Sequence, residues 1–212
     1  MLILHGAGSR KENHADFARL CASRGWAALS FDARGHGETG GEMSGDAVED
    51  AVAMARFLAA TGGVDARRIA VRGSSLGGFL AIHAAAAAPE IAGVIAICPA
   101  GEDQLARGLR SGRLEVAVAD PVAMEAWLLA HDLREAVERL GRRPLILLHA
   151  EGDDQIPVDW SQQLYERKVE PRKLIFVPGG HHRSVQHDAE LQGAALRWLE
   201  RELARSRSPR PS

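Results

Sequence analysis

The sequence contains little cysteine: 2 of its 212 residues, Cys21 and Cys98. They do not form a CxxC pair, and two cysteines are too few for the disulfide framework of a small secreted protein. We therefore expect both thiols to be reduced and buried. No segment of basic and then apolar residues opens the chain, which favours a cytoplasmic location over secretion.

Long apolar runs and an excess of either charge are also missing. The longest strongly apolar run, residues 79–89, is interrupted by His83 and is far shorter than the ~20 residues that a membrane-spanning helix needs. The formal net charge of -2 gives no electrostatic reason to expect nucleic acid or an acidic membrane as a partner. We expect a soluble protein that binds neither of them.

The motifs of metal and nucleotide sites are absent as well. His181, His182 and His187 lie near one another, but there is no HExxH and no CxxC that would indicate a metal site. The glycine-rich residues 35–41 lack the GxxxxGK sequence of a phosphate-binding loop, and no GxGxxG follows the first apolar segment. We expect no metal and no other cofactor.

Short apolar segments alternate along the chain with longer segments whose apolar residues recur at helical spacing. The segments that predict buried strands are residues 1–4, 27–31, 69–72, 94–98, 145–149 and 174–177. The segments that predict helices are residues 13–24, 44–61, 77–88, 161–167 and 188–203. This alternation predicts a mostly parallel sheet with helices on both faces.

The length allows one sizeable core, so we expect a single domain over residues 1–204. The polar, proline-containing end, residues 205–212, predicts a disordered tail. Residues 101–140 interrupt the alternation and contain no convincing strand, which favours a lid near the working face of the sheet. Asp120 and Pro121 would start a helix in this insert.

The segment GSSLGG, residues 73–78, lies between a predicted strand and a predicted helix. A nucleophile elbow places a serine at the apex of a very tight turn, with glycine two residues before it and two residues after it. Ser75 has Gly73 and Gly77 at those positions, whereas the corresponding neighbours of Ser74 are larger. The pattern therefore predicts Ser75 as the nucleophile.

A serine hydroxyl is a weak nucleophile at neutral pH, so it needs a base, and the base needs an orienting acid. Acidic residues follow one late strand in EGDDQIP, residues 151–157, and histidines follow the last strand in PGGHHR, residues 178–183. Because the carboxyl ends of parallel strands meet at one end of the sheet, both loops should lie beside Ser75. The positions alone leave several candidates open: Glu151, Asp153 and Asp154 for the acid, and His181 and His182 for the base.

In these motifs the chain resembles an α/β-hydrolase of the small esterase and serine-aminopeptidase-like group. The resemblance runs from residue 2 to about residue 203 and is carried by HGAG at 5–8, FDARGHGETGG at 31–41, GSSLGG at 73–78, EGDDQIP at 151–157 and PGGHHR at 178–183. It implies the α/β-hydrolase fold, with a mostly parallel sheet of about six strands, helices on both faces and a short helical lid.

The resemblance also implies a role for particular residues. The family pattern D-x-x-I/V-P selects Asp153 as the acid, and a histidine three residues after a glycine selects His182 as the base. The backbone N–H groups of Ala7 and Leu76 would form the oxyanion hole. His5 and Asp32, which lie in the matching segments HGAG and FDARGHGETGG, would shape their loops rather than catalyse.

We expect acyl transfer from a small-molecule carboxylic ester to water, through an acyl-enzyme on Ser75. The acyl group would be small to medium because the insert is short and mostly apolar; Met124, Trp127 and Leu128 of its helix would contact the substrate. Thioesters and short peptide or amide bonds are alternative substrates, and a non-catalytic binding protein with this fold is the alternative class. Serine at the elbow disfavours the chemistries of family members that carry aspartate or cysteine there.

The chain departs from the family in one respect. The family usually has one or two strands before the strand that leads to HGxG, whereas residue 1 of this sequence already belongs to that strand. Either the sheet is a minimal one of about six strands, or the natural start lies upstream of Met1.

Overall fold

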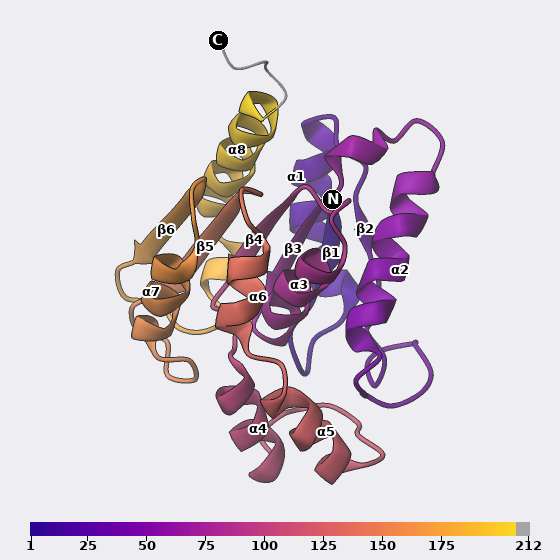
Figure 1. Cartoon of the computed structure of the whole chain (residues 1–212), viewed down its shortest axis with the longest axis vertical. Coiled ribbons are helices and arrows are strands. Elements are labelled where there is room, and N and C mark those ends of the chain that lie inside the picture. Colours follow the sequence, from indigo (N-terminus) through magenta and orange to yellow (C-terminus); the bar gives the residue numbers. More distant parts are fainter. Residues whose placement is uncertain (207–212) are drawn as a thin grey trace.

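A computed structural model describes residues 1–206 of the chain. One sheet contains the six strands β1 (Leu2–Leu4), β2 (Leu29–Ser30), β3 (Ala70–Ser74), β4 (Gly93–Ile97), β5 (Leu145–Ala150) and β6 (Arg172–Val177). Their order across the sheet is β2-β1-β3-β4-β5-β6, and every neighbouring pair is parallel (Figure 1). The predicted parallel α/β sheet is therefore confirmed.

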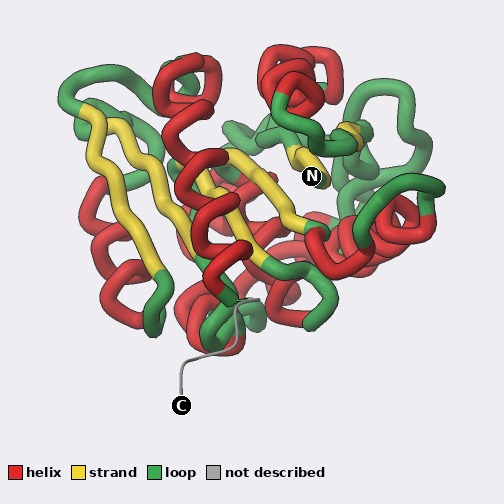
Figure 2. The backbone as a smooth tube through the Cα atoms, turned by 90° about the horizontal axis from the view of Figure 1, so that it is seen from above, coloured by secondary structure: helices red, strands yellow, loops and turns green. Residues whose placement is uncertain are grey.

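The helices and 3-10 turns connect these strands. They are η1 (Lys11–His14), α1 (Ala15–Ser23), α2 (Ala47–Ala60), η2 (Ala66–Arg68), α3 (Leu76–Ala87), α4 (Glu102–Arg110), α5 (Pro121–Leu129), α6 (Leu133–Arg139), α7 (Val158–Arg167), η3 (Val185–His187) and α8 (Ala189–Arg205). Figure 2 shows the strands as a layer with helices on either side.

The two faces of the sheet are buried in two separate cores, because successive side chains of a strand point to opposite faces. On β3, for example, Val71 belongs to the core under α2, α3 and α6, while Ala70 belongs to the core under α1 and α8. The central strands β3, β4 and β5 are buried along their whole length. Burial on both faces explains why these strands are continuous apolar runs rather than alternating ones.

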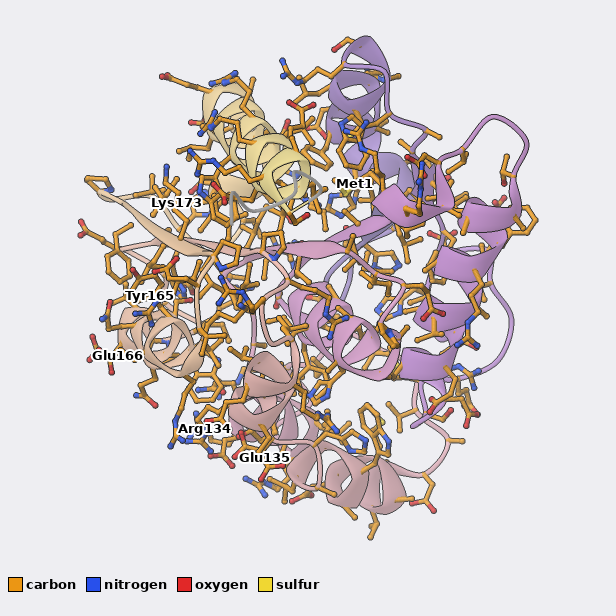
Figure 3. The ribbon with its side chains drawn as sticks, turned by 45° about the horizontal axis from the view of Figure 1, so that its top comes forward. Met1, Arg134, Glu135, Tyr165, Glu166 and Lys173 are labelled. Carbon is orange, nitrogen blue, oxygen red and sulfur yellow. The ribbon has the colours of Figure 1, made fainter. Side chains whose placement is uncertain are left out.

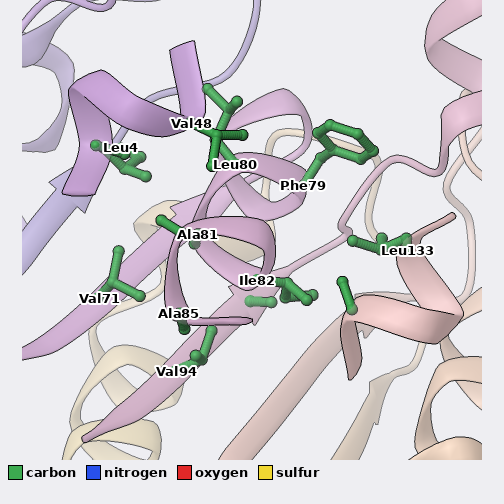
Figure 4. Packing of buried hydrophobic residues seen from close by; sticks show 14 of the residues in the cluster. Leu4, Val48, Val71, Phe79, Leu80, Ala81, Ile82, Ala85, Val94 and Leu133 are labelled. Carbon is green, nitrogen blue, oxygen red and sulfur yellow. The ribbon is translucent and has the colours of Figure 1, made fainter. Parts of the chain in front are cut away.

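The alanine-rich helix α3 packs closely on the centre of the sheet. Of its 12 residues, 10 are buried, which small side chains allow because the helix backbone then approaches the strands. Figure 4 shows α3 between Val71 and Val94 of the sheet and Leu133 of α6. This packing fixes the beginning of α3, where the candidate nucleophile lies.

The insert at residues 101–140 forms three helices, α4, α5 and α6, at the carboxyl end of β4 (Figure 1). Helix α5 begins as predicted: the Asp120 side chain accepts hydrogen bonds from the N–H groups of Val122 and Ala123, and Pro121 is the first helical residue. Helix α4 was not predicted from the sequence. Charged side chains such as Glu135 and Glu166 lie on the outside of the molecule (Figure 3).

At its carboxyl end the chain is helical further than predicted, because α8 continues to Arg205. The remainder of the predicted disordered tail, residues 207–212, lies outside the described residues. Within residues 1–206, no helix is both long enough and apolar enough to cross a bilayer.

Candidate active site

Ser75 lies at the turn between β3, which ends at Ser74, and α3, which begins at Leu76. Its backbone has φ 53° and ψ -120°, a conformation that residues other than glycine rarely adopt. The turn is held from both sides: the Ser75 N–H donates to the Ile97 carbonyl at 2.9 Å, and the Ser75 carbonyl accepts from Gly78 at 2.9 Å. The strain and its restraints are those of a nucleophile elbow.

The two glycines that flank Ser75 are required by the space around the turn. A Cβ on Gly73 would overlap the carbonyl of Gly77, and a Cβ on Gly77 would overlap the carbonyl oxygens of Leu4 and His5. Backbone atoms cannot move aside as a flexible side chain can. The spacing on which the prediction of Ser75 rested therefore has a direct steric cause.

Asp153 follows β5 and His182 follows β6, and a hydrogen bond joins their side chains. Nδ1 of His182 lies 2.7 Å from Oδ2 of Asp153. The other carboxylate oxygen, Oδ1, accepts from the N–H groups of Gln155 and Ile156, both at 2.9 Å. These two bonds fix the carboxylate in its loop, so that it presents one oxygen to the histidine.

The environment of Asp153 favours the ionised carboxylate. Its side chain is 0% exposed, and burial by itself would raise its pKa. Hydrogen bonds from His149, His182 and the Ile156 N–H outweigh this effect and hold the pKa of Asp153 well below its usual range. A charged acid beside Nδ1 stabilises the histidine tautomer that leaves Nε2 free to accept a proton.

The neighbouring candidates are arranged differently. Asp154 and Glu151 are exposed, and neither bonds to a histidine in the described part of the chain. His181 is exposed, and its Nδ1 accepts from the Arg183 N–H at 3.3 Å. Of these candidates, the geometry thus pairs only Asp153 with His182; their catalytic roles stay predictions.

The loop after β1 lies against Ser75. A Cβ added to Gly6 would lie 3.3 Å from the Cβ of Ser75, so this glycine allows the close approach. Ala7 faces the same cavity as Ser75. Leu76 is the first residue of α3, and the N–H of a first helical residue has no partner within the helix. Both predicted oxyanion donors are thus beside the nucleophile.

His5 holds this loop in place. Its Nε2 accepts the Ala33 N–H at 3.0 Å, so the ring proton is on Nδ1, which donates to the Gly6 carbonyl at 2.8 Å. Burial lowers the pKa of His5, which keeps the ring neutral. Asp32 binds the Lys11 ammonium at 2.7 Å and the Glu38 N–H at 3.1 Å. Both residues shape loops, as the resemblance implied.

A cavity of about 1080 Å³ opens over Ser75 and His182. Gln186 and His187, Asn13 and Ser9 lie along it with other polar residues, and Leu105, Leu114 and Ile156 are its larger apolar side chains. The part of the insert that lines it is α4 and the segment after α4, residues 104–115. Polar side chains outnumber apolar ones among the residues that line the cavity.

The prediction that Met124, Trp127 and Leu128 contact the substrate is wrong for this structure, because none of the three lines the cavity. Met124 and Leu128 are buried in the core under α3, with exposures of 3% and 0%. The Trp127 ring lies 6.0 Å from Phe79 and stacks on His131 at 4.1 Å. The apolar face of α5 fastens the insert to the domain.

Two neighbours of Asp153 were not predicted from the sequence. Nε2 of the fully buried His149 lies 3.4 Å from Oδ2 of Asp153, and the Cys98 thiol also contacts this carboxylate. His149 belongs to β5, and Cys98 directly follows β4. In the sequence, no local motif distinguishes either residue from its neighbours. Only the pairing of β4 with β5 brings them together.

Donor atoms of Cys98, Asp153 and His182 lie within 4.8 Å of one another, which raises the question of a metal. Burial raises the pKa of the Cys98 thiol to about 12, so it stays protonated, whereas metals bind the thiolate. Nδ1 of His182 and Oδ2 of Asp153 are already bonded to each other. The donor set therefore suits a catalytic pair better than a metal.

Comparisons with known proteins show which family the chain resembles. A family model described as serine aminopeptidase, S33, matches residues 1–140. The protein Rv2307c of Mycobacterium tuberculosis is 27% identical over 208 residues, which cover 96% of this chain and 70% of that protein. The protein YqkD of Bacillus subtilis is 28% identical over 199 residues, which cover 86% of this chain and 64% of that one.

Among solved structures, Est1E of Butyrivibrio proteoclasticus with bound ferulic acid superposes with a TM-score of 0.76. The two are 20% identical, and the match covers 96% of this chain and 88% of that one. At this level of identity the likeness concerns the fold, in which the elbow, the acid loop and the histidine loop occupy one end of the sheet.

Proposed function

Because the chain belongs to the serine aminopeptidase S33 family of α/β-hydrolases, we propose that it hydrolyses a carboxylic ester with a small to medium acyl group. The observation that carries the proposal is the 2.7 Å hydrogen bond between His182 and Asp153 at the end of the sheet where Ser75 occupies a strained elbow. A buried, ionised acid that orients a histidine beside a serine is the arrangement that acyl transfer requires.

The reaction would proceed in two half-reactions. Oγ of Ser75 attacks the ester carbonyl while Nε2 of His182 takes its proton, and the N–H groups of Ala7 and Leu76 stabilise the oxyanion. The protonated histidine then gives the proton to the leaving alcohol, which departs and leaves an acyl-enzyme. Water attacks this ester with the same base, and the acid is released with Ser75 restored.

In the described residues the Ser75 hydroxyl forms no hydrogen bond to His182. Catalytic hydrogen bonds often tighten only in the substrate complex. A rotation of the serine side chain about χ1, on binding of the ester, would bring Oγ toward Nε2. This step belongs to the proposal and is tested with it.

The cavity supports a substrate with polar groups. Its larger apolar side chains are few, which suits a short acyl chain, and polar side chains such as Asn13 and Gln104 offer hydrogen bonds to an alcohol or acid that carries polar groups. The family description names an aminopeptidase, which favours a short peptide or amide bond as the second candidate. Both substrates use the same three residues.

The test is a matched set of substrates and a mechanism-based probe. A fluorophosphonate should label wild-type protein at Ser75 and leave Ser75→Ala unlabelled. Hydrolysis of p-nitrophenyl esters should be fastest at short to medium acyl length, and an amino-acid p-nitroanilide should be slower than the corresponding p-nitrophenyl ester. Label on another serine would overturn the assignment of Ser75, and no label on folded protein would refute a serine hydrolase. The reverse order of the ester and the anilide would favour the peptidase.

A further inference from the structure

Arg72 is a buried charge on the central strand, three residues before Ser75. Its side chain is 0% exposed, and its guanidinium lies 5.3 Å from the centre of the Phe17 ring. Burial lowers its pKa to about 10, so the group is charged at neutral pH. No carboxylate forms an ion pair with it within residues 1–206. Burying such a charge costs free energy that an apolar side chain would not, which favours a role beyond packing.

The guanidinium has two hydrogen-bond partners. Nη1 lies 2.7 Å from Nδ1 of His14, and Nη2 donates to the carbonyl of Gln186 at 3.0 Å. Burial first, and then the neighbouring Arg72, lower the pKa of His14 to about 3. His14 is therefore neutral at physiological pH and accepts the Arg72 proton. The guanidinium thus contacts η1 through Nη1 and η3 through Nη2.

Gln186 is fixed at both its backbone and its side chain. Its carbonyl accepts from Arg72 and also from Nε2 of Gln192 at 2.6 Å. Its side-chain Oε1 accepts from Oγ of Ser74 at 2.7 Å. Arg72 and Ser74 are two residues apart on β3, so they point to the same face of the sheet and reach the same residue. Ser74 directly precedes Ser75, and Arg72 precedes it by three residues.

Gln186 is also close in sequence to the candidate base: it follows His182 by four residues. Asp153 orients the His182 ring through Nδ1, but it belongs to the loop after β5 and not to the strand that carries Ser75. The histidine loop itself begins with Gly179 and Gly180, both at positive φ. The hydrogen bonds to Gln186 connect this loop to β3.

We infer that Arg72, Ser74 and Gln186 form a clamp that sets the distance between His182 and Ser75. They are positioning residues: they act through the histidine loop, and the inference rests on the proposed function. The clamp makes the strand that presents the nucleophile also hold the loop that presents its base. A displacement of about 1 Å between reacting groups is enough to lower turnover on the order of a hundredfold.

The first test is a double-mutant cycle on the side-chain bond. Gln186→Met should lower kcat about tenfold, because it removes the bond to Ser74 but leaves both bonds to the Gln186 carbonyl. Ser74→Ala should lower kcat by less than about tenfold, and the double variant should be no slower than Gln186→Met. KM for a p-nitrophenyl ester should stay within about twofold. Gln163→Met, the same change at an exposed glutamine of α7, should keep wild-type values.

The second test separates positioning from stability. Arg72→Met should lower kcat by about ten- to a hundredfold at a temperature well below its Tm, where the variant is folded. Its Tm should also decrease, because the substitution leaves the buried Nδ1 of His14 without its partner. Arg72→Lys keeps the charge but not the two-pronged geometry, so it should recover only part of kcat. If Arg72→Met does not fold, the double-mutant cycle on Ser74 and Gln186 still tests whether the clamp positions His182.

The outcomes are distinct. Wild-type kcat in Gln186→Met and Arg72→Met, with a lower Tm, would overturn the clamp and leave a contact that only stabilises the fold. Additive losses in the cycle would overturn the coupling of Ser74 to Gln186. A wild-type protein that neither turns over esters nor reacts with a fluorophosphonate would defeat the proposed function instead, and the variants would then show no kcat to compare.

Discussion

His182 and Asp153 come from different loops, after β6 and β5, yet their side chains lie 2.7 Å apart. The carboxylate is fully enclosed and receives two further N–H bonds, so it stays ionised and stationary under the ring. This pairing fixes which nitrogen of the ring faces the cavity.

Replacing the nucleophile should abolish turnover. Ser75→Ala should lower kcat by about six orders of magnitude, as removal of the serine from a catalytic triad does. Ser74→Ala should retain kcat within about tenfold, because the Ser74 hydroxyl donates to the Gln186 side chain and not to the proposed acid or base. Ester hydrolysis by both variants, with circular dichroism to show that they fold, checks the assignment; a greater loss in Ser74→Ala would shift the nucleophile by one residue.

Replacing the acid should disturb the histidine tautomer. Asp153→Asn should lower kcat by about four orders of magnitude, because an amide nitrogen donates to Nδ1 and leaves the proton on Nε2. Asp154→Asn is the matched control: its side chain is exposed and does not bond to His182, so kcat should remain near wild type. The same comparison applies to His182→Ala and His181→Ala. Equal losses within either pair would contradict the pairing.

Trp127 should matter for stability and not for substrate choice. Its ring packs on Phe79 and His131 and is absent from the cavity wall, so Trp127→Ala should cost about 3 kcal/mol of unfolding free energy and leave the ester-length profile unchanged. Leu114→Ala, in the segment that does line the cavity, should change kcat/KM between neighbouring acyl lengths by about 1–3 kcal/mol. A changed profile in Trp127→Ala alone would restore the lid role of α5.

Stability should decrease in mild acid because of two buried histidines. Burial lowers the pKa of His14 and of His83 from 6.5 to about 3 in the folded protein, and further lowering comes from Arg72 and from His131 respectively. Between these pH values the unfolded chain binds more protons, so stability is full above pH 6.5 and is lost as pH falls. The slope is about 1.4 kcal/mol per pH unit for each histidine.

Urea unfolding at pH 7 and pH 5 measures this loss, which should be about 2 kcal/mol for each of the two residues. His83→Leu should reduce the loss between pH 7 and pH 5 by about 2 kcal/mol, because it removes one of the two buried rings. An unfolding free energy that is equal at the two pH values would show that these rings are not held neutral.

The sheet and the elbow could be predicted because their causes are local. Strands buried on both faces are continuous apolar runs, and the elbow needs glycine at positions 73 and 77 to avoid backbone overlap. The choice of Asp153 and His182 came from the resemblance, and the geometry pairs the same two residues.

The contacts of Arg72, the burial of α5 and the cavity residues of α4 could not be predicted, because they depend on contacts between distant segments. Arg72 reads as an ordinary strand residue until Gln186, 114 positions later, is placed beside it. The apolar side chains of α5 have the same spacing whether they face a substrate or a core, so the sequence did not distinguish the two. Helix α4 is strongly polar on its outer face and contributes cavity residues such as Gln104, which no motif identifies.

The strand order divides the chemistry of the site between two consecutive lengths of chain. Ser75 and both proposed oxyanion donors belong to residues 1–140, the part that the family model matches, while Asp153 and His182 both follow α6. These two lengths meet along the hydrogen bonds between β4 and β5. Ser75 and the proposed acid and base, Asp153 and His182, are therefore assembled across one seam of the sheet, and separation of that seam should abolish the proposed hydrolysis with all three residues still present.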